Sequence, residues 1–206
     1  MKKTLSIIAN LVFFTGLISY AGTADKTIEN LKYAFIGEST ASAKYAAYAE
    51  QAKKEGFVQI AIMFEATSKA EAIHAANHKS VLEKMGQKVD PVKPIFTVQT
   101  TNLNLVYALK GESDEISTMY PGFIETAKTE DAKGAVKSFS WALDTEKKHL
   151  AMYKNAISAM NEKKESSLPK IYWVCPKCGN TFDIPKPTGE CGFCGTASEK
   201  FIKFDK

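Results

Sequence analysis

The sequences EAIH (residues 71–74) and EKKH (residues 146–149) repeat one pattern, a glutamate followed three residues later by a histidine. Both copies lie inside long stretches in which apolar residues recur at helical spacing. Residues three positions apart lie on one face of a helix, so each copy directs a carboxylate and an imidazole toward the same small volume. Two such pairs on two helices can bind two metal ions.

Further carboxylates occur on two other helical stretches, at Glu38 and at the pair Glu112 and Glu115. Glu38 shares a helix face with Ala41 and Tyr45, and a charged side chain on an inward face needs a partner such as a metal. One Glu from each of two helices and Glu-x-x-His from each of two others is the arrangement of ferritin-like di-iron or di-manganese bundles. The fold class that we predict is therefore mainly α, a ferritin-like four-helix bundle.

Periodicity and helix-stop residues give the extent of the four helices. We expect them over residues 24–55, 57–85, 101–120 and 131–160. Gly56 and Gly86 are placed to end the first two, and Pro121 interrupts the third at Tyr120. Residues 87–100 contain two prolines and no helical period, so we expect a long crossover from one end of the bundle to the other.

His78 is the remaining histidine of the second helix. It lies seven residues after Glu71 and therefore on the same face, but about 10 Å further along the helix axis. We interpret it as a histidine that supports the site or caps a neighbouring group, with a ligand role as the alternative.

The four cysteines form two C-x-x-C turns, Cys175 with Cys178 and Cys191 with Cys194. Each turn is followed by a glycine and directs two thiolates at one ion, which gives a closed tetrahedral site that admits zinc or iron. Disulfides are the alternative, but paired C-x-x-C turns make poor staples for a small core. We expect residues 166–206 to form a small metal-dependent module.

The beginning of the chain has the pattern of an export signal. Residues 1–21 hold two lysines, an apolar run and small residues before an expected cleavage after Ala21; an uncleaved membrane anchor is the alternative. The bundle then occupies residues 22–165. All 27 basic residues are lysine, and no run of like charge stands out, which argues against nucleic acid as a partner.

Taken together, these residues resemble the rubrerythrin family, a ferritin-like di-iron bundle fused to a C-terminal rubredoxin-like β domain. The resemblance covers nearly everything after residue 24 and is carried, in order, by Gly37-Glu38-Ser39, Glu71-x-x-His74-Ala75, Gly111-Glu112 with Glu115, Met119-Tyr120-Pro121 and Glu146-x-x-His149. It implies di-iron ligands at Glu38, Glu71, His74, Glu112, Glu115, Glu146 and His149, and one iron at Cys175, Cys178, Cys191 and Cys194. Tyr45 and Tyr120 match tyrosines that lie beside the di-iron site.

The resemblance implies that the protein reduces hydrogen peroxide to water, with the rubredoxin-like iron returning electrons to the di-iron site. We hypothesise from it that Glu115 and His74 exchange as ligands at one iron. The expected partners are hydrogen peroxide, an unidentified electron-donor protein and further copies of the chain, in the periplasm. A ferroxidase or iron-storage protein and a zinc-ribbon binding module are the alternative functions; the cysteines count against the first and the inward carboxylates against the second.

Overall fold

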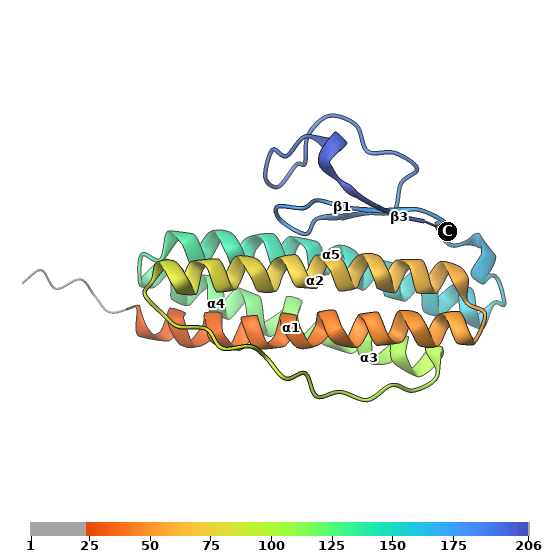
Figure 1. The fold of residues 1–206 in the computed structure, drawn as a ribbon, viewed down its shortest axis with the longest axis horizontal. Coiled ribbons are helices and arrows are strands. Elements are labelled where there is room, and N and C mark those ends of the chain that lie inside the picture. Colours follow the sequence, from red (N-terminus) through yellow and green to blue (C-terminus); the bar gives the residue numbers. More distant parts are fainter. Residues whose placement is uncertain (1–23, 206) are drawn as a thin grey trace, which may run out of the picture.

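The computed structural model describes residues 24–205, and the predicted export signal at residues 1–21 lies outside this range. Four helical rods form an elongated bundle, and a small sheet lies on one side of it (Figure 1). The helices are α1 (Asp25–Lys54), α2 (Val58–Lys84), α3 (Thr101–Asp114), α4 (Tyr120–Thr129) and α5 (Lys133–Asn161). Within residues 24–205, no helix has the length and apolar character needed to cross a membrane.

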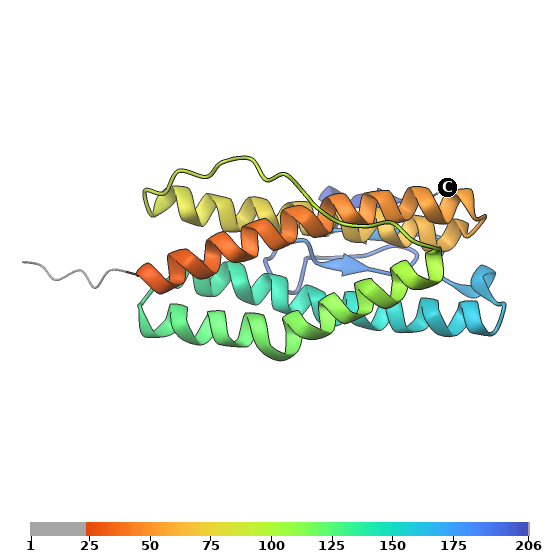
Figure 2. The ribbon, with the colours of Figure 1, turned by 90° about the horizontal axis from the view of Figure 1, so that it is seen from below.

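The first two helices end as their glycines predict. Gly56 and Gly86 adopt φ angles of 85° and 76°, a left-handed conformation that residues with a Cβ rarely adopt. The segment after α2, residues 87–100, contains no helix and runs along the bundle to the start of α3 at its opposite end (Figure 2). This long connection confirms the predicted crossover.

The third rod is interrupted directly before Tyr120, where Pro121 predicts an interruption. A π-helical turn, Glu115–Met119, joins α3 to α4 there, and Pro121 follows as the second residue of α4. The π turn bends the rod (Figure 2). Such turns are rare and occur often at functional sites.

Two apolar clusters fill the bundle, one on each side of its middle. One cluster includes Tyr45, Phe64 and Tyr153, and the other includes Tyr120 and Phe139. Along α1, α2 and α5 the residues of the two clusters are separated by Glu38, by His74 and by Glu146 with His149, respectively. The polar site is therefore sealed at both ends by tightly packed side chains.

The C-terminal module is a three-stranded antiparallel sheet with strand order β2-β1-β3. Its strands are β1 (Tyr172–Val174), β2 (Thr181–Phe182) and β3 (Ile202–Phe204), with Trp173 paired to both Phe182 and Lys203. The sheet lies over α2 and α5 (Figure 1). The structure confirms the predicted small β region, whereas the predicted boundary after residue 165 stays a prediction; it falls within a 3₁₀ turn, Glu165–Ser167.

Candidate metal centres

Six of the seven carboxylate and histidine ligands predicted for the bundle converge at its centre. Their ligand atoms form two groups, each within a sphere that suits one ion: Glu38, Glu71, His74 and Glu146, and Glu71, Glu112, Glu146 and His149. Within each group the atoms lie within 4.8 Å of one another, and all six residues are buried. The two groups share two glutamates, so the arrangement suits a pair of ions rather than two separate ones.

Glu71 and Glu146 are placed to bridge the pair. One oxygen of Glu146 lies 2.9 Å from Nδ1 of His74, and its other oxygen lies 2.8 Å from Nδ1 of His149. Glu71 repeats this geometry, with its oxygens 2.9 Å and 3.1 Å from the same two nitrogen atoms. Glu71 and Glu146 would therefore hold both ions, and each histidine would hold one of them through Nδ1.

The two remaining carboxylates are each held by a tyrosine. Tyr45 donates its hydroxyl proton to Oε1 of Glu112 over 2.8 Å, and Tyr120 donates to Oε1 of Glu38. In both glutamates, Oε2 is buried and has no hydrogen-bond partner among the described residues. The tyrosines thus fix each carboxylate through one oxygen and leave the other free to bind a metal, in the positions beside the site that the sequence predicts for them.

The donor set fits a di-iron centre. Buried oxygens of Glu71 and Glu146 and the Nδ1 atoms of both histidines also lack hydrogen-bond partners among residues 24–205. Buried carboxylates without partners are costly, and two divalent cations would neutralise the four that meet here. Mixed carboxylate and imidazole ligation is the environment that non-haem iron accepts.

Glu115, the seventh predicted ligand, lies beside the site but outside both groups. It is the first residue of the π turn and is half-buried. Burial, followed by the nearby Glu146 and Glu71 carboxylates, raises the pKa of its carboxyl group well above 4.5. Its role as a ligand stays a prediction. His78 also lies outside both groups, as we interpreted it.

Without a cation, bound protons have to neutralise the site. Burial and neighbouring carboxylates raise the pKa of Glu38 and Glu112 well above 4.5. Burial lowers the pKa of His149, but Glu71 and Glu146 outweigh this effect and raise that pKa to about 9. Metal binding must displace these protons, so we expect iron affinity to fall as the pH is lowered.

The metal-free protein should lose stability as the pH rises from 7 to 9, above the range in which the lowered pKa of His78 acts in the opposite direction. The pKa of each of four groups is higher in the folded protein than in the unfolded chain: Glu38, Glu112, His74 and His149. Protonation of such a group stabilises the folded state, and this stabilisation is lost as the pH rises through the folded-state pKa. The two histidines lower the pKa of Glu146 despite its burial, so Glu146 changes the pH dependence of stability only below pH 4.5. Each kcal/mol lost lowers the Tm by about 2–4 °C in a chain of this size. Thermal melts of apoprotein across this range test the sign; a Tm that rises with pH contradicts it, and iron-loaded protein is the control.

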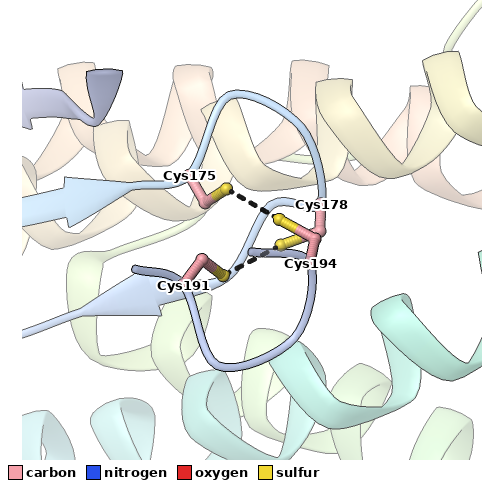
Figure 3. A group of neighbouring side chains, drawn as sticks. All are labelled: Cys175, Cys178, Cys191 and Cys194. Atoms are coloured by element: carbon pink, nitrogen blue, oxygen red, sulfur yellow. Dashed lines mark hydrogen bonds between the residues drawn. The ribbon is translucent and has the colours of Figure 1, made fainter. Parts of the chain in front are cut away.

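The four cysteines converge on a second centre in the C-terminal module (Figure 3). The Sγ atoms of Cys175 and Cys194 lie 3.5 Å apart, as do those of Cys178 and Cys191. A disulfide requires about 2.05 Å, so all four are free thiols arranged around one small volume. The backbone N–H groups of Gly179 and Gly195 close the two turns. This S4 geometry fits a mononuclear Fe(Cys)4 centre, and zinc has the same preference.

The first cysteine turn lies directly against the histidines of the bundle. Gly179 packs on the His74 ring so closely that an added Cβ would stand 2.7 Å from Cδ2 of His74 and nearer still to its Nε2. Thr181 donates to the carbonyl of Gly179 and lies 3.0 Å from Nε2 of His149. Because the Thr181 hydroxyl proton is already used, Nε2 of His149 carries the proton of this hydrogen bond. The Nδ1 lone pair is then free for a metal, as ligating histidines require.

Side chains of α5 fasten the module in this position. Lys148 donates to Oδ1 of Asn180 over 2.5 Å and lies over the ring of Phe182 at 4.4 Å. Trp141 donates to the Phe193 carbonyl at 3.2 Å. Sequence reasoning missed these contacts, and it also missed Thr181 and Gly179 as neighbours of the histidines. They join segments far apart in the chain, and no residue spacing signals them.

Comparison with known proteins agrees with the geometry of both centres. Residues 29–157 match the rubrerythrin family. Rubrerythrin-2 of Clostridium acetobutylicum is 35% identical over 181 residues, which cover 86% of this chain and 96% of that protein. Nigerythrin of Nitratidesulfovibrio vulgaris is 33% identical over 180 residues, which cover 87% of this chain and 87% of that protein.

Solved structures give the same result for the fold. Nigerythrin in its fully reduced, all-ferrous state has a TM-score of 0.78 at 32% identity, with 86% of each chain covered. A bacterioferritin of Desulfovibrio desulfuricans has a TM-score of 0.65 at 20% identity over 71% of this chain and 86% of that one, a likeness of fold alone. The predicted ferritin-like fold is confirmed, and the chain belongs to the rubrerythrin family.

Proposed function

We propose that the protein is a peroxidase that reduces hydrogen peroxide to water at the bundle centre as a defence against oxidative stress. When bound, the iron pair would supply two electrons to peroxide, and the Fe(Cys)4 iron would restore them one at a time. The protein supplies the environment for this chemistry. Its glutamates balance the ionic charge, its tyrosines orient two of them, and its apolar clusters keep bulk water away from both ends of the site.

The observation that carries this proposal is the contact between the two centres. Gly179, the residue after Cys178, packs on His74, and Thr181 holds His149 through its hydroxyl group. An iron-storage bundle has no use for an electron carrier fastened to its metal-binding histidines. A zinc-ribbon module does not require four buried carboxylates arranged around two ion positions that share two of them.

Metal analysis of protein made in iron-replete medium, followed by anaerobic addition of peroxide to the reduced form, tests the proposal. We expect about three irons per chain, two for the bundle and one for the cysteines, and oxidation of all three by peroxide. Two irons with one zinc would instead favour iron storage or a zinc-ribbon variant, and an empty bundle contradicts both iron functions.

Replacing Glu115 with Ala should slow peroxide turnover while leaving the bundle loaded with iron. The six clustered ligands remain in the variant, and Glu115 lies outside both groups. A carboxylate that joins the site only in its oxidised state would stabilise that state, so we expect turnover to fall by about tenfold or more. Stopped-flow kinetics and iron stoichiometry measure the two effects together. Wild-type turnover at full occupancy would mean that Glu115 does not take part.

We further propose that the protein is exported to the periplasm, which the pattern of residues 1–21 supports. N-terminal mass analysis should find a mature chain that begins at Gly22. An intact Met1 in a membrane fraction would support the uncleaved anchor instead, and an intact Met1 in the cytoplasm would contradict both.

The expected partners are peroxide, a separate electron-donor protein and further copies of the chain. Self-association is supported by large apolar side chains exposed on α1, on α3 and in the crossover, namely Tyr33, Ile36, Ile95, Leu103, Val106 and Tyr107. Analytical ultracentrifugation of the loaded protein measures the subunit count, and a monomer at all concentrations would contradict this expectation.

A further inference from the structure

His78 is a fully buried histidine that no metal position uses. Its Nδ1 lies 2.8 Å from Oγ of Ser138 on α5, and its Nε2 lies 3.2 Å from the Tyr120 hydroxyl on α4. Tyr120 in turn donates to Glu38 at the metal site. Four side chains from four helices therefore form one continuous row of hydrogen bonds that ends on a predicted metal ligand.

The hydrogen atoms of this row have one consistent arrangement. The single hydroxyl proton of Tyr120 is donated to Glu38, so the Tyr120 oxygen accepts from His78, whose Nε2 must carry a proton. Nδ1 of the neutral ring then accepts the Ser138 proton. Burial, with a further contribution from His74, lowers the pKa of His78 to about 3, so the ring is neutral at physiological pH. Every O–H and N–H in the row thus points toward the metal site.

The outer end of the row is Ser138, which is 5% exposed. Ser138 lines a surface groove of about 400 Å³ between α2 and the first turns of α5, together with Lys84, Lys133 and Lys137. The inner members are enclosed: His78 and Tyr120 are fully buried, and the ring of Phe139 packs 5.3 Å from that of His78. Protons at the groove therefore have a polar route inward through otherwise apolar packing.

We propose that Ser138, His78 and Tyr120 conduct protons from this groove to Glu38 at the metal site. The inference rests on the proposed function, since reduction of one hydrogen peroxide breaks the O–O bond, takes up two electrons from the ferrous pair and two protons, and yields two waters. For each proton that Tyr120 passes to Glu38, His78 gives its Nε2 proton to Tyr120, Ser138 gives its proton to Nδ1, and water in the groove restores Ser138. The imidazole changes tautomer and does not become charged. Before the second proton can pass, His78 returns to the Nε2–H tautomer and the hydroxyl groups of Tyr120 and Ser138 turn back.

Three substitutions separate proton transfer from packing. His78→Gln keeps one donor and one acceptor, but an amide does not exchange tautomers readily, and Ser138→Ala removes the entry hydroxyl. We expect single-turnover oxidation by peroxide to slow about 10²-fold in the first variant and about tenfold in the second, within the range of general acid–base effects. The solvent deuterium isotope effect should grow in both. Ser138→Thr restores a hydroxyl and should recover the wild-type rate.

Ser68→Ala is the matched control, because Ser68 also makes a half-buried hydrogen bond between helices, to the Ser42 carbonyl at 2.8 Å, and lies outside the row. It should react like the wild type. Wild-type rates in His78→Gln and Ser138→Ala at full iron loading would overturn the proton path. Equal slowing in Ser138→Thr and Ser138→Ala would also overturn it, since packing would then be the cause.

Nitrogen-15 NMR of metal-free protein tests the row without any turnover. The chain has only three histidines, which simplifies assignment. We expect His78 to be neutral with its proton on Nε2 at pH 7; a proton on Nδ1, or a charged ring, would overturn the inference. If wild-type protein fails to reduce peroxide while this NMR result holds, the proposed function is wrong, whereas active wild-type protein with the opposite tautomer removes only the proton path.

Discussion

Replacing Gly179 with Ala will uncouple the two metal centres without emptying either one. The new Cβ would stand 2.7 Å from Cδ2 of His74, a distance that Cβ atoms essentially never adopt, and 3.2 Å from the Ala70 carbonyl, which is tighter than most Cβ contacts. Both neighbours belong to the body of α2, so the cysteine turn has to move away from the bundle. Displacements of about 1 Å can cost about 10²-fold in rate where geometry is critical. We expect re-reduction of the bundle by the Fe(Cys)4 centre to slow by about that factor.

Gly195→Ala is the control that the chain itself supplies. Gly195 occupies the equivalent position after the second C-x-x-C turn and has a φ angle of 69°, close to the 82° of Gly179. Its added Cβ would meet only an oxygen of Glu190 at 3.8 Å. Both variants therefore suffer the strain of a left-handed alanine, but only one meets α2. Stopped-flow absorption of the Fe(Cys)4 centre after a peroxide pulse compares them, and equal rates in the two variants would show that the contact does not couple the centres.

Replacing Glu146 with Ala should remove both irons from the bundle and leave the cysteine iron in place. Glu146 lies in both ligand groups, with one oxygen 2.9 Å from Nδ1 of His74 and the other 2.8 Å from Nδ1 of His149. Its loss takes a ligand from each position and half of the bridging charge. Iron content should fall from about three per chain to about one, with peroxide turnover lost.

The Glu115→Ala variant is the matched control for this loss, because it removes a carboxylate near the site that belongs to neither group. It should retain its iron. The comparison is valid only if circular dichroism shows that the Glu146→Ala variant retains its helical bundle. Visible absorption from the Fe(Cys)4 centre then shows that the C-terminal module is intact. A Glu146→Ala protein that keeps both bundle irons would contradict the bridging geometry.

Much of the bundle was predictable because its ligands lie on helices, where sequence spacing translates directly into direction. Glu-x-x-His at residues 71–74 and 146–149 places both ligands of each helix on one face, and the structure brings them together. The same rule places Glu112 and Glu115 on one face. It holds as far as Glu115, whose backbone N–H still reaches the Gly111 carbonyl as in an α-helix. Spacing therefore gives the shared face, but not which of the two carboxylates enters a ligand group.

The relation between the two centres could not be predicted from the sequence. Gly179 and His74 are at least a hundred residues apart, as are the two ends of the hydrogen bond from Asn77 to the Lys177 carbonyl. Spacing within a C-x-x-C turn predicts how its thiolates point but not which surface the turn covers. The distance of His78 along the helix predicted that it lies outside the ligand groups, whereas its partners Ser138 and Tyr120 come from other helices and became visible only in the fold.

The most direct test of the central claim is an anaerobic titration of fully reduced, iron-loaded protein with hydrogen peroxide, followed by optical and Mössbauer spectroscopy. The structure and the proposed function predict that about one equivalent of peroxide oxidises the bundle pair, because the reaction takes two electrons. The Fe(Cys)4 centre should lose its electron afterwards, at a rate that depends on Gly179. Three ferrous irons hold three electrons and one peroxide takes two, so complete oxidation of a chain should need about 1.5 equivalents. A bundle pair that stays fully ferrous after one equivalent of peroxide is consumed, or an Fe(Cys)4 centre that is oxidised first and independently of the bundle, would contradict the account.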